Sequence, residues 1–397
     1  MRFYFSLIIF ISLTACVQVP EQGIVNTVIQ IQTPPAPLTE QSPFGETISI
    51  IPIEKVFQLN QLQQQDFLSF YHNKKYSRVY PNHRISRYLK KKLATFGFFT
   101  ETLTASEGVE SEQGNCLSLA ILTHALAKLV NVEFSHDLVA TPALFRKENG
   151  VVLSTQHVKS LLYDPKHDNE EGFFMLIRGR VTIDYFPVDG TQTLRNVRED
   201  EFNAMYYQNK SVEAYVKGNN NLSYWYAVAA LNQHKNDAQA INMIAILYNK
   251  AGLNQHAEAM YQHGIKYSDN KFELLNNYQL YLVKNKRLAE ANIISQQLNT
   301  YDQPNPFKWV TLGNRLYQQG LYSKAISAYK KALKIADYLH EPYFGIARSE
   351  FLKGNLHRAK AAMGQAIKKS SEQQGPSKYE TKYDAITKLL EKRSGAN

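Results

Sequence analysis

The chain has 397 residues, which is too long for one ordinary domain and enough for two sizeable hydrophobic cores. Hydrophobic residues make up 44% and aromatic residues 12%, values that exclude a mainly disordered protein. The net charge is +10, but the lysines are scattered along predicted helices and no motif of a nucleic-acid-binding fold is present. Nucleic acid is therefore not an expected partner, whereas weak attraction to anionic membrane or glycan surfaces fits the charge.

The first residues have the pattern of an export signal. A positive charge precedes the apolar run 3–13, which is too short to span a bilayer, so residues 1–15 are predicted to be a cleavable signal peptide. The sequence Leu-Thr-Ala-Cys at 13–16 resembles a bacterial lipobox, which implies cleavage before Cys16 and a diacylglycerol on its sulfur. Val17, in place of aspartate, favours the outer membrane. The expected product is a lipid-anchored protein of the bacterial cell envelope, at the outer membrane and facing the periplasm. The alternative is an ordinary secretory signal.

Residues 16–60 are predicted to form a tether between the lipid anchor and the folded protein. Prolines among Gln, Thr and Ser favour an extended, unpacked chain. Strand-like character at 47–51 indicates that the end of this tether packs on the folded part.

Residues 61–203 are predicted to form an α+β domain. Helical periodicity extends over 61–99, a polar loop covers 108–114, and a core helix begins at Cys116 and ends near Val130. Three strand-like segments follow, and the last two are separated by turn residues typical of an antiparallel hairpin. These segments cover 133–139, 151–163 and 173–186.

Residues 204–397 contain an internal repeat. Glycines recur at offsets of 34 or 68 residues, a lysine stands at the one missing position, and a small side chain follows each of these five positions. The glycine positions are Gly218, Gly252, Lys286, Gly320 and Gly354, and the small residues are Ser223, Ala257, Ala291, Ala325 and Ala359. This period is typical of the tetratricopeptide repeat. We predict about five repeats, starting near 204, 238, 272, 306 and 340, and a C-terminal helix with Tyr383, Ile386, Leu389 and Leu390 that caps the all-α solenoid.

Cys116 is the candidate for chemistry. The chain has only two cysteines, and because the lipid occupies Cys16, Cys116 is a single thiol in an oxidising compartment. Such a thiol is either an inert core residue or a reactive one. A position at the start of a helix favours the thiolate, the nucleophilic form, because unpaired backbone N–H groups and the helix dipole stabilise negative charge.

Two side chains on the predicted hairpin are suitable partners for this thiol. His157 lies in the first strand and Asp184 in the second, so that an imidazole base and an orienting carboxylate can share one face. The backbone N–H of Cys116 and the side-chain amide of Gln113 are candidate oxyanion donors. No ligand spacing for a metal site is present, and no cofactor is expected.

The order Cys, His, Asp resembles the transglutaminase-like thiol superfamily, and in particular bacterial lipoproteins of this kind with C-terminal tetratricopeptide repeats. The resemblance is carried by Gly114-Asn115-Cys116-Leu117-Ser118, Gln156-His157-Val158 and Ile183-Asp184-Tyr185-Phe186. It implies a nucleophilic cysteine, a histidine acting as general base and acid, an orienting aspartate, and acyl transfer or hydrolysis at an amide bond. No calcium-binding loop of the animal cross-linking enzymes is apparent.

Two functions follow from these patterns. The first is an envelope enzyme that acts on amide bonds and whose repeat groove recruits a protein or peptide. The second is a catalytically inactive scaffold whose repeats bind a partner in an envelope complex.

Overall fold

The computed structural model describes only part of the chain, and all described residues belong to the unit formed by residues 35–397. Among the described residues, none of the helices has both the length and the apolar character needed to cross a membrane. The signal peptide, the lipobox with Cys16 and the first part of the tether lie outside the described residues. The described ranges are 36–38, 42–92, 97–98, 101–140, 145–148, 151–154, 157–165, 179–184, 192–298, 300–301, 306–374 and 379–394.

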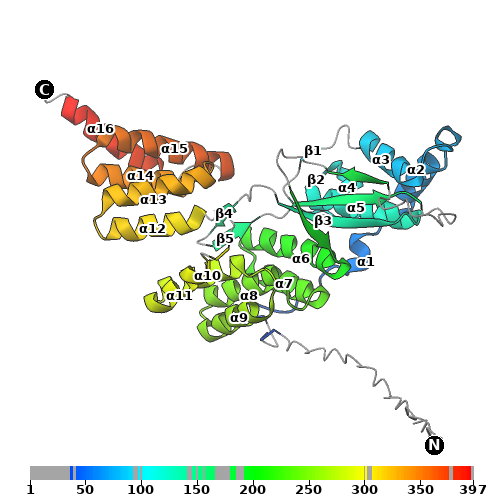
Figure 1. Ribbon diagram of the computed structural model, residues 1–397, viewed down its shortest axis with the longest axis horizontal. Coiled ribbons are helices and arrows are strands. Elements are labelled where there is room, and N and C mark those ends of the chain that lie inside the picture. The colour runs from blue at the N-terminus through cyan, green and yellow to red at the C-terminus, as the bar shows by residue number, and fades with distance from the viewer. Residues whose placement is uncertain are drawn as a thin grey trace, which may run out of the picture. The chain divides into compact units, whose positions relative to one another are not determined.

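Helices dominate the first part of this unit (Figure 1). They are α1 (Ile53–Val56), α2 (Gln61–Tyr71), a 3-10 turn (Lys74–Tyr76), α3 (Pro81–Lys92), α4 (Ala105–Ser111) and α5 (Cys116–Leu129). Helix α4 corrects the predicted polar loop at 108–114. Thr104 caps this helix, because its hydroxyl accepts from the backbone N–H of Glu107 while the Glu107 carboxylate accepts from that of Thr104.

An antiparallel sheet follows these helices. Its strands are β3 (Phe134–Ala140), β6 (His157–Tyr163), β7 (Arg180–Ile183) and β8 (Gln192–Val197), in the order β7-β6-β3-β8. The pairing of β6 with β7 confirms the predicted hairpin over its described part, and β3 confirms the strand predicted at 133–139. Residues 166–178 and 185–186 of the hairpin lie outside the described residues.

Four shorter strands form two further pairs. Strands β1 (Gly97–Phe98) and β2 (Gln113–Gly114) are parallel, and β4 (Phe145–Glu148) and β5 (Val151–Ser154) are antiparallel. The single strand predicted at 151–163 is therefore two strands, because β5 pairs with β4 and β6 pairs in the main sheet.

The remaining helices form successive hairpins that match the predicted repeats in register (Figure 1). The four glycines at the repeat position have φ between 76° and 81°, and Lys286 adopts the same left-handed region at 61°. The lysine therefore fills a position whose backbone favours glycine. The hairpins are α6 (Glu199–Val216) with α7 (Asn220–Gln233), α8 (Ala238–Lys250) with α9 (Asn254–Tyr267), α10 (Phe272–Lys284) with α11 (Leu288–Leu298), α12 (Pro306–Gln318) with α13 (Tyr322–Ile335), and α14 (His340–Leu352) with α15 (Leu356–Gln374).

Helix α16 (Glu380–Ser394) packs on the last repeat, as predicted for a capping helix. Ile386 is buried in a cluster with Met363, and Tyr383 and Leu390 are partly buried beside them. Leu389 is 42% exposed, so it lies on the solvent side of the helix and its predicted role in the cap is wrong.

Part of the predicted tether is packed against the first repeat. The hydroxyl of Tyr207 donates to the carbonyl of Ile51 over 2.7 Å, and the indole N–H of Trp225 donates to the carbonyl of Glu46 over 3.2 Å. Val56 is fully buried. The end of the predicted tether therefore packs on the folded part, as expected, although it forms no strand at 47–51.

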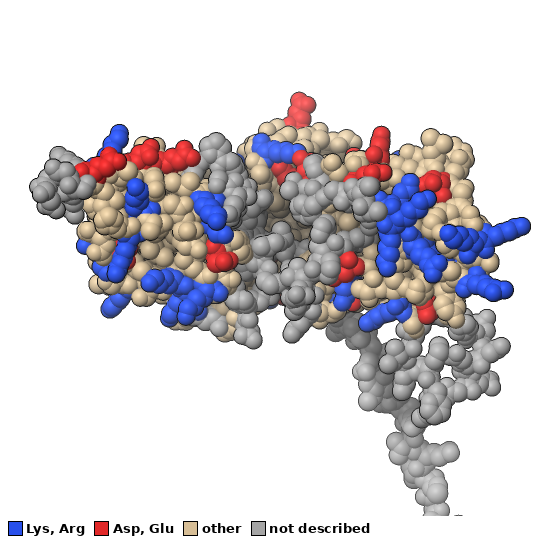
Figure 2. Space-filling model, turned by 90° about the horizontal axis from the view of Figure 1, so that it is seen from above, with Lys and Arg blue, Asp and Glu red and all other residues tan. Residues whose placement is uncertain are grey.

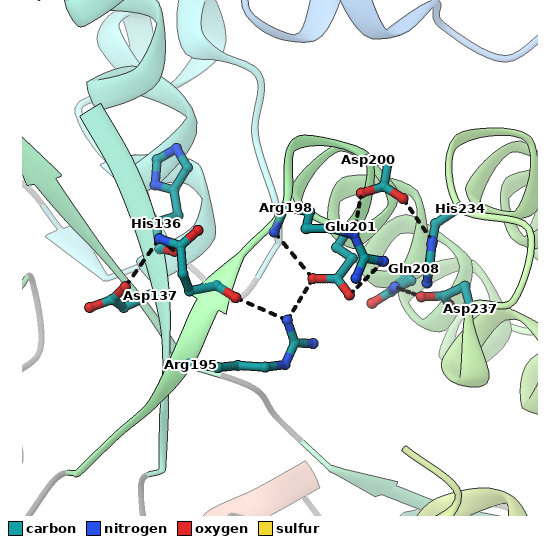
Figure 3. Close-up of polar contacts among 10 residues, drawn as sticks. His136, Asp137, Arg195, Arg198, Asp200, Glu201, Gln208, His234 and Asp237 are labelled. Carbon is teal, nitrogen blue, oxygen red and sulfur yellow. Dashed lines mark hydrogen bonds and ion pairs between the residues drawn. The ribbon is translucent and has the colours of Figure 1, made fainter. Parts of the chain in front are cut away.

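A polar network joins strand β8 to the first repeat (Figure 3). Arg195 of β8 and Arg198 both pair with the carboxylate of Glu201 in α6, over 2.6 and 3.0 Å. Arg198 also pairs with Asp200, which pairs with His234 at the end of α7. The first helix of the array therefore begins before the predicted boundary at 204 and is bonded to the sheet.

Candidate functional site

Cys116 lies at the first position of α5, as the sequence predicts. Asn115 is the N-cap, because its side-chain oxygen accepts from the backbone N–H of Ser118 over 2.9 Å. The Asn115 amide donates to the hydroxyl of Thr102 over 3.0 Å, which fixes the cap on a neighbouring segment. The thiol is therefore carried by a well-defined helix start, and its residue is half-buried.

The surroundings of the sulfur favour the thiol over the thiolate. Burial is the largest effect and raises the pKa of the Cys116 thiol, and the negative charge of Asp184 adds to the rise. The backbone N–H groups of Val158, Leu117 and Cys116 lower this pKa by a smaller amount. The pKa of Cys116 is therefore above its ordinary value. This is opposite to the expectation that the position at a helix start favours the thiolate.

The structure brings His157 and Asp184 together. His157 is the first residue of β6, Asp184 follows the last residue of the adjacent strand β7, and the ring Nε2 lies 3.0 Å from a carboxylate oxygen of Asp184. The two side chains are 9% and 20% exposed. Because a carboxylate can only accept, Nε2 carries the proton and Nδ1 is left as an acceptor.

The thiol belongs to the same cluster. The backbone N–H of Val158, the residue directly after His157, lowers the pKa of the thiol, and the negative charge of Asp184 raises it, so both groups lie near the sulfur. The helix start and the two strands therefore bring the thiol, the imidazole and the carboxylate into one region of the fold.

Gln113 is placed differently. It is exposed, lies in β2, and lines a surface cavity of about 310 Å³ together with Leu103, Glu107, Glu110 and Ser111. None of the three clustered residues lines this cavity. Its proposed role as an oxyanion donor stays a prediction.

Two buried histidines lie side by side, one on helix α5 and one on strand β3. His124 of α5 stacks on Phe57 with 4.2 Å between ring centroids, and His136 of β3 stacks on Phe202 of α6 with 3.8 Å. The two histidines are 2% and 4% exposed, and burial lowers the pKa of each to about 3. Both histidines are therefore packed core residues. The burial of His136 could have been predicted from its position on the same strand face as Phe134.

The repeat array has exposed apolar residues at one recurring place. Val216, Val283 and Phe351 lie at the ends of the first helices of the first, third and fifth repeats, and Leu352 follows the last of these. They are between 37% and 48% exposed. Val283 and Phe351 stand three residues before the glycine position of their repeats. Val216 and Leu352 stand two residues before it, so each of these two positions recurs.

Comparison with known proteins identifies the repeats. The family model named tetratricopeptide repeat matches residues 306–338, the fourth predicted repeat. The hairpins of the C-terminal half are therefore a tetratricopeptide repeat domain. No curated protein matches the chain.

Several solved structures are similar to part of the chain at 16% identity. They include the tetratricopeptide protein TTC0263 of Thermus thermophilus, with a TM-score of 0.39 and coverage of 46% of this chain and 98% of that one. PilF of Pseudomonas aeruginosa has a TM-score of 0.40, covering 50% of this chain and 88% of its own. The type IV pilus biogenesis factor PilW has a TM-score of 0.36, with coverage of 42% and 78%.

Proposed function

We propose that the chain is a lipid-anchored scaffold of the bacterial cell envelope, whose tetratricopeptide array binds a protein or peptide segment. The observation that carries this proposal is the recurrence of exposed apolar side chains at the ends of the first helices. Isolated exposed apolar residues are ordinary, but a set found at the same place in several repeats forms a surface that a partner can bury.

A photo-crosslinking amino acid tests this surface. Placed at Val283, on the first helix of the third repeat, it should give a discrete adduct with a partner protein in cells that express the chain. Ile293 is the matched control, because it is 56% exposed, apolar and carried by the second helix of the same repeat. The same adduct at both positions, or none at Val283, would contradict the proposal.

The lipid anchor has its own test. Cys16→Ala should move the chain from the membrane fraction to the soluble fraction and remove the incorporation of labelled fatty acid. An unchanged distribution would contradict the anchor and leave partner binding by the array intact.

A second function is supported by the pairing of His157 with Asp184 beside the thiol. In this proposal the domain is transglutaminase-like and acts on an amide bond. Because the thiol is neutral, His157 takes its proton as the sulfur attacks the carbonyl, and returns it to the amine that leaves. Asp184 holds the ring and stabilises the imidazolium. Water or a second amine then breaks the thioester.

Alkylation of Cys116 distinguishes the two functions. An assisted thiol reacts with iodoacetamide in the native state, and the rate falls by about 10²-fold or more in His157→Ala, as for loss of a general base. His83→Ala, at an exposed site on α3, is the control. A thiol that reacts only after unfolding would leave the scaffold as the function of the chain.

A further inference from the structure

A dense group of positive charges covers the 3-10 turn after α2 and the outer side of α3. Residues 72–92 contain eight Lys and Arg and no Asp or Glu. Six of the eight are exposed, and we call them the basic face: Lys74, Lys75, Arg78, Arg87, Lys90 and Lys91. Figure 2 shows Lys and Arg side chains gathered over this part of the molecule, at the right of the view. Such a concentration of one sign of charge attracts an anionic partner.

Aromatic rings join the turn and the helix into one surface. The ring centroid of Tyr76, in the turn, lies 5.8 Å from both the ammonium of Lys75 and the guanidinium carbon of Arg87. Tyr76 also packs on Phe70 of α2, with 4.7 Å between ring centroids, and the ammonium of Lys91 lies 5.8 Å from the Phe70 centroid. Three cations of the basic face therefore lie around one pair of rings, so the face is continuous from the turn to α3.

The packing of α3 fixes the direction in which its charges point. Three residues of its inner side are at most 2% exposed, namely Ile85, Tyr88 and Leu89. Arg87, Lys90 and Lys91 are spaced by three and four residues and lie together on the outer side. Like charges at this spacing repel each other and destabilise a helix, so the basic face does not serve the stability of the fold.

The described part of the chain leaves the basic face largely without counter-charge. None of the ion pairs among the described residues involves any of its six members. The neighbouring Lys92 lies 2.8 Å from the carboxylate of Asp66 and holds the pKa of that carboxyl below its ordinary value, and Lys91 adds to this effect. Asp66 is thus already paired at the edge of the face, and an external anionic surface would stabilise the remaining charges.

The proposed lipid anchor brings the basic face to a membrane. Ala36, the first described residue, packs on the hydrophobic core. The segment 17–35 between Cys16 and Ala36 has 19 residues and can span at most about 65 Å. The anchor can therefore stay in the bilayer while the basic face lies on the surface of the same membrane.

We propose that the basic face binds an anionic phospholipid surface and holds the first part of the folded unit against the membrane. The inference rests on the proposed function, because the lipid anchor supplies the first membrane contact. Each Lys or Arg near an anionic membrane raises the partition coefficient about fivefold, and this effect falls off within about 10 Å at 0.1 M salt. Six cations on one rigid face therefore determine which side of the unit meets the bilayer. Tyr80, 51% exposed between the turn and α3, adds an amphipathic ring of the kind found at membrane interfaces.

Co-sedimentation with vesicles tests the basic face. The chain from residue 17 onward is used, because a lipid on Cys16 would hold it on any vesicle, and this chain keeps the complete unit of residues 35–397. It should sediment with vesicles that contain phosphatidylglycerol and not with vesicles of phosphatidylcholine alone, and the bound fraction should fall as salt is added. Inorganic phosphate at the concentration of the lipid phosphate should not displace it, because the basic face meets a charged surface and not a single headgroup.

The double variant Lys90→Gln with Lys91→Gln should lower the affinity for phosphatidylglycerol vesicles by about tenfold or more, from about fivefold for each charge. It should not lower the thermal midpoint, because it relieves repulsion along α3, so weaker binding will not reflect unfolding. Lys330→Gln with Lys331→Gln is the matched control, since it removes two adjacent exposed lysines from α13 and should change the affinity by less than about twofold. This control is strict, because residues 306–397 contain 17 Lys and Arg against 7 Asp and Glu.

Three results would overturn the proposal. These are equal binding to both kinds of vesicle, equal effects of the two double variants, and binding of dextran sulfate through Lys90 and Lys91 without binding to phosphatidylglycerol vesicles. No vesicle binding, together with membrane fractionation that is lost in Cys16→Ala, would refute the basic face and leave the lipid anchor standing. Vesicle binding that depends on Lys90 and Lys91, together with fractionation that ignores Cys16, would support the basic face and refute the anchor.

Discussion

Acid should destabilise the fold through the stacked histidine pair. In the unfolded chain His124 and His136 have the ordinary pKa of 6.5, and in the fold burial lowers both to about 3. Above pH 6.5 neither ring lowers the free energy of unfolding. As the pH falls from 6.5 toward 3, each ring lowers this free energy progressively, because the unfolded chain binds a proton that the fold excludes. The charge of Lys128 also lowers the pKa of His124, and the charge of His124 also lowers that of His136.

The size of this effect is large compared with the stability of a domain. Below pH 6.5 each histidine lowers the free energy of unfolding by about 1.4 kcal/mol per pH unit. At pH 5 this free energy is therefore lower by about 2 kcal/mol for one ring and by about 4 kcal/mol for the pair. A domain has about 5–15 kcal/mol in total. Mild acid should therefore remove a substantial part of the stability of the core that carries Cys116.

The substitution His124→Phe removes one of the two rings, together with the contact of 3.4 Å between its Nδ1 and Nε2 of His136. A phenyl group suits the position, since Phe57 and Phe134 already lie 4.2 and 4.5 Å from the imidazole centroid and the ring Nε2 has no hydrogen-bond partner. Urea unfolding at pH 7, 6 and 5 should show a pH slope that is smaller than that of the native chain by about 1.4 kcal/mol per unit. His83→Phe, at an exposed site, should leave the slope unchanged. Equal slopes for the native chain and His124→Phe would refute the reasoning.

Three further predictions concern single residues. Burial raises the pKa of Asp237 from 3.8 to about 6, so the fold loses stability as the pH rises through this window and the carboxyl group ionises. Asp237→Asn should therefore stabilise the fold at pH 7 by at most about 3 kcal/mol and have little effect at pH 3, measured by urea unfolding. Gly313→Ala places a Cβ 2.5 Å from the ring of Tyr329 and should cost about 1–3 kcal/mol, whereas Gly364→Ala, 3.7 Å from its nearest neighbour, should not lower the thermal midpoint. Because burial raises the pKa of Cys116 above 9.0, its alkylation rate in His157→Ala, which lacks the assisting base, should still be rising above pH 9, and a plateau of that variant at neutral pH would contradict a neutral thiol.

The repeats could be predicted because their signals are local. A glycine with positive φ follows four of the five first helices, and a small residue comes after it where two helices meet, so both requirements appear in the sequence at a fixed period. Even Lys286, which breaks the glycine pattern, takes the same backbone conformation, with φ of 61°.

The elements that were missed have no such signal. Helix α4 has a polar sequence and ends at Glu112, which takes a φ of 50° without a glycine. Strand β8 is an edge strand in which Leu194 is 57% exposed, so no alternation of apolar residues marks it.

The candidate site was predictable in part. His157 and Asp184 could be paired because a hairpin places residues of adjacent strands side by side. The pKa of Cys116 could not, because it depends on which distant segments bury the sulfur. The histidine stack could not be predicted either, since Phe57 and Phe202 reach it from segments that no local pattern connects.

Helix α6 packs on both the sheet and the first hairpins within one continuous hydrophobic core, and this makes the boundary predicted at 204 testable. Phe202, in its first turns, is 1% exposed and stacks on His136 of the sheet, while later residues of the same helix pack on α7. Phe202→Ala should therefore cost about 3–5 kcal/mol and lower amide-exchange protection in both β3 and α8. Phe351→Ala, at a 37% exposed site, should change neither. Loss of protection confined to β3 would show that the array folds independently of the sheet, whereas a joint loss means that a partner bound to the first repeat also stabilises the strand that packs over the Cys116 helix.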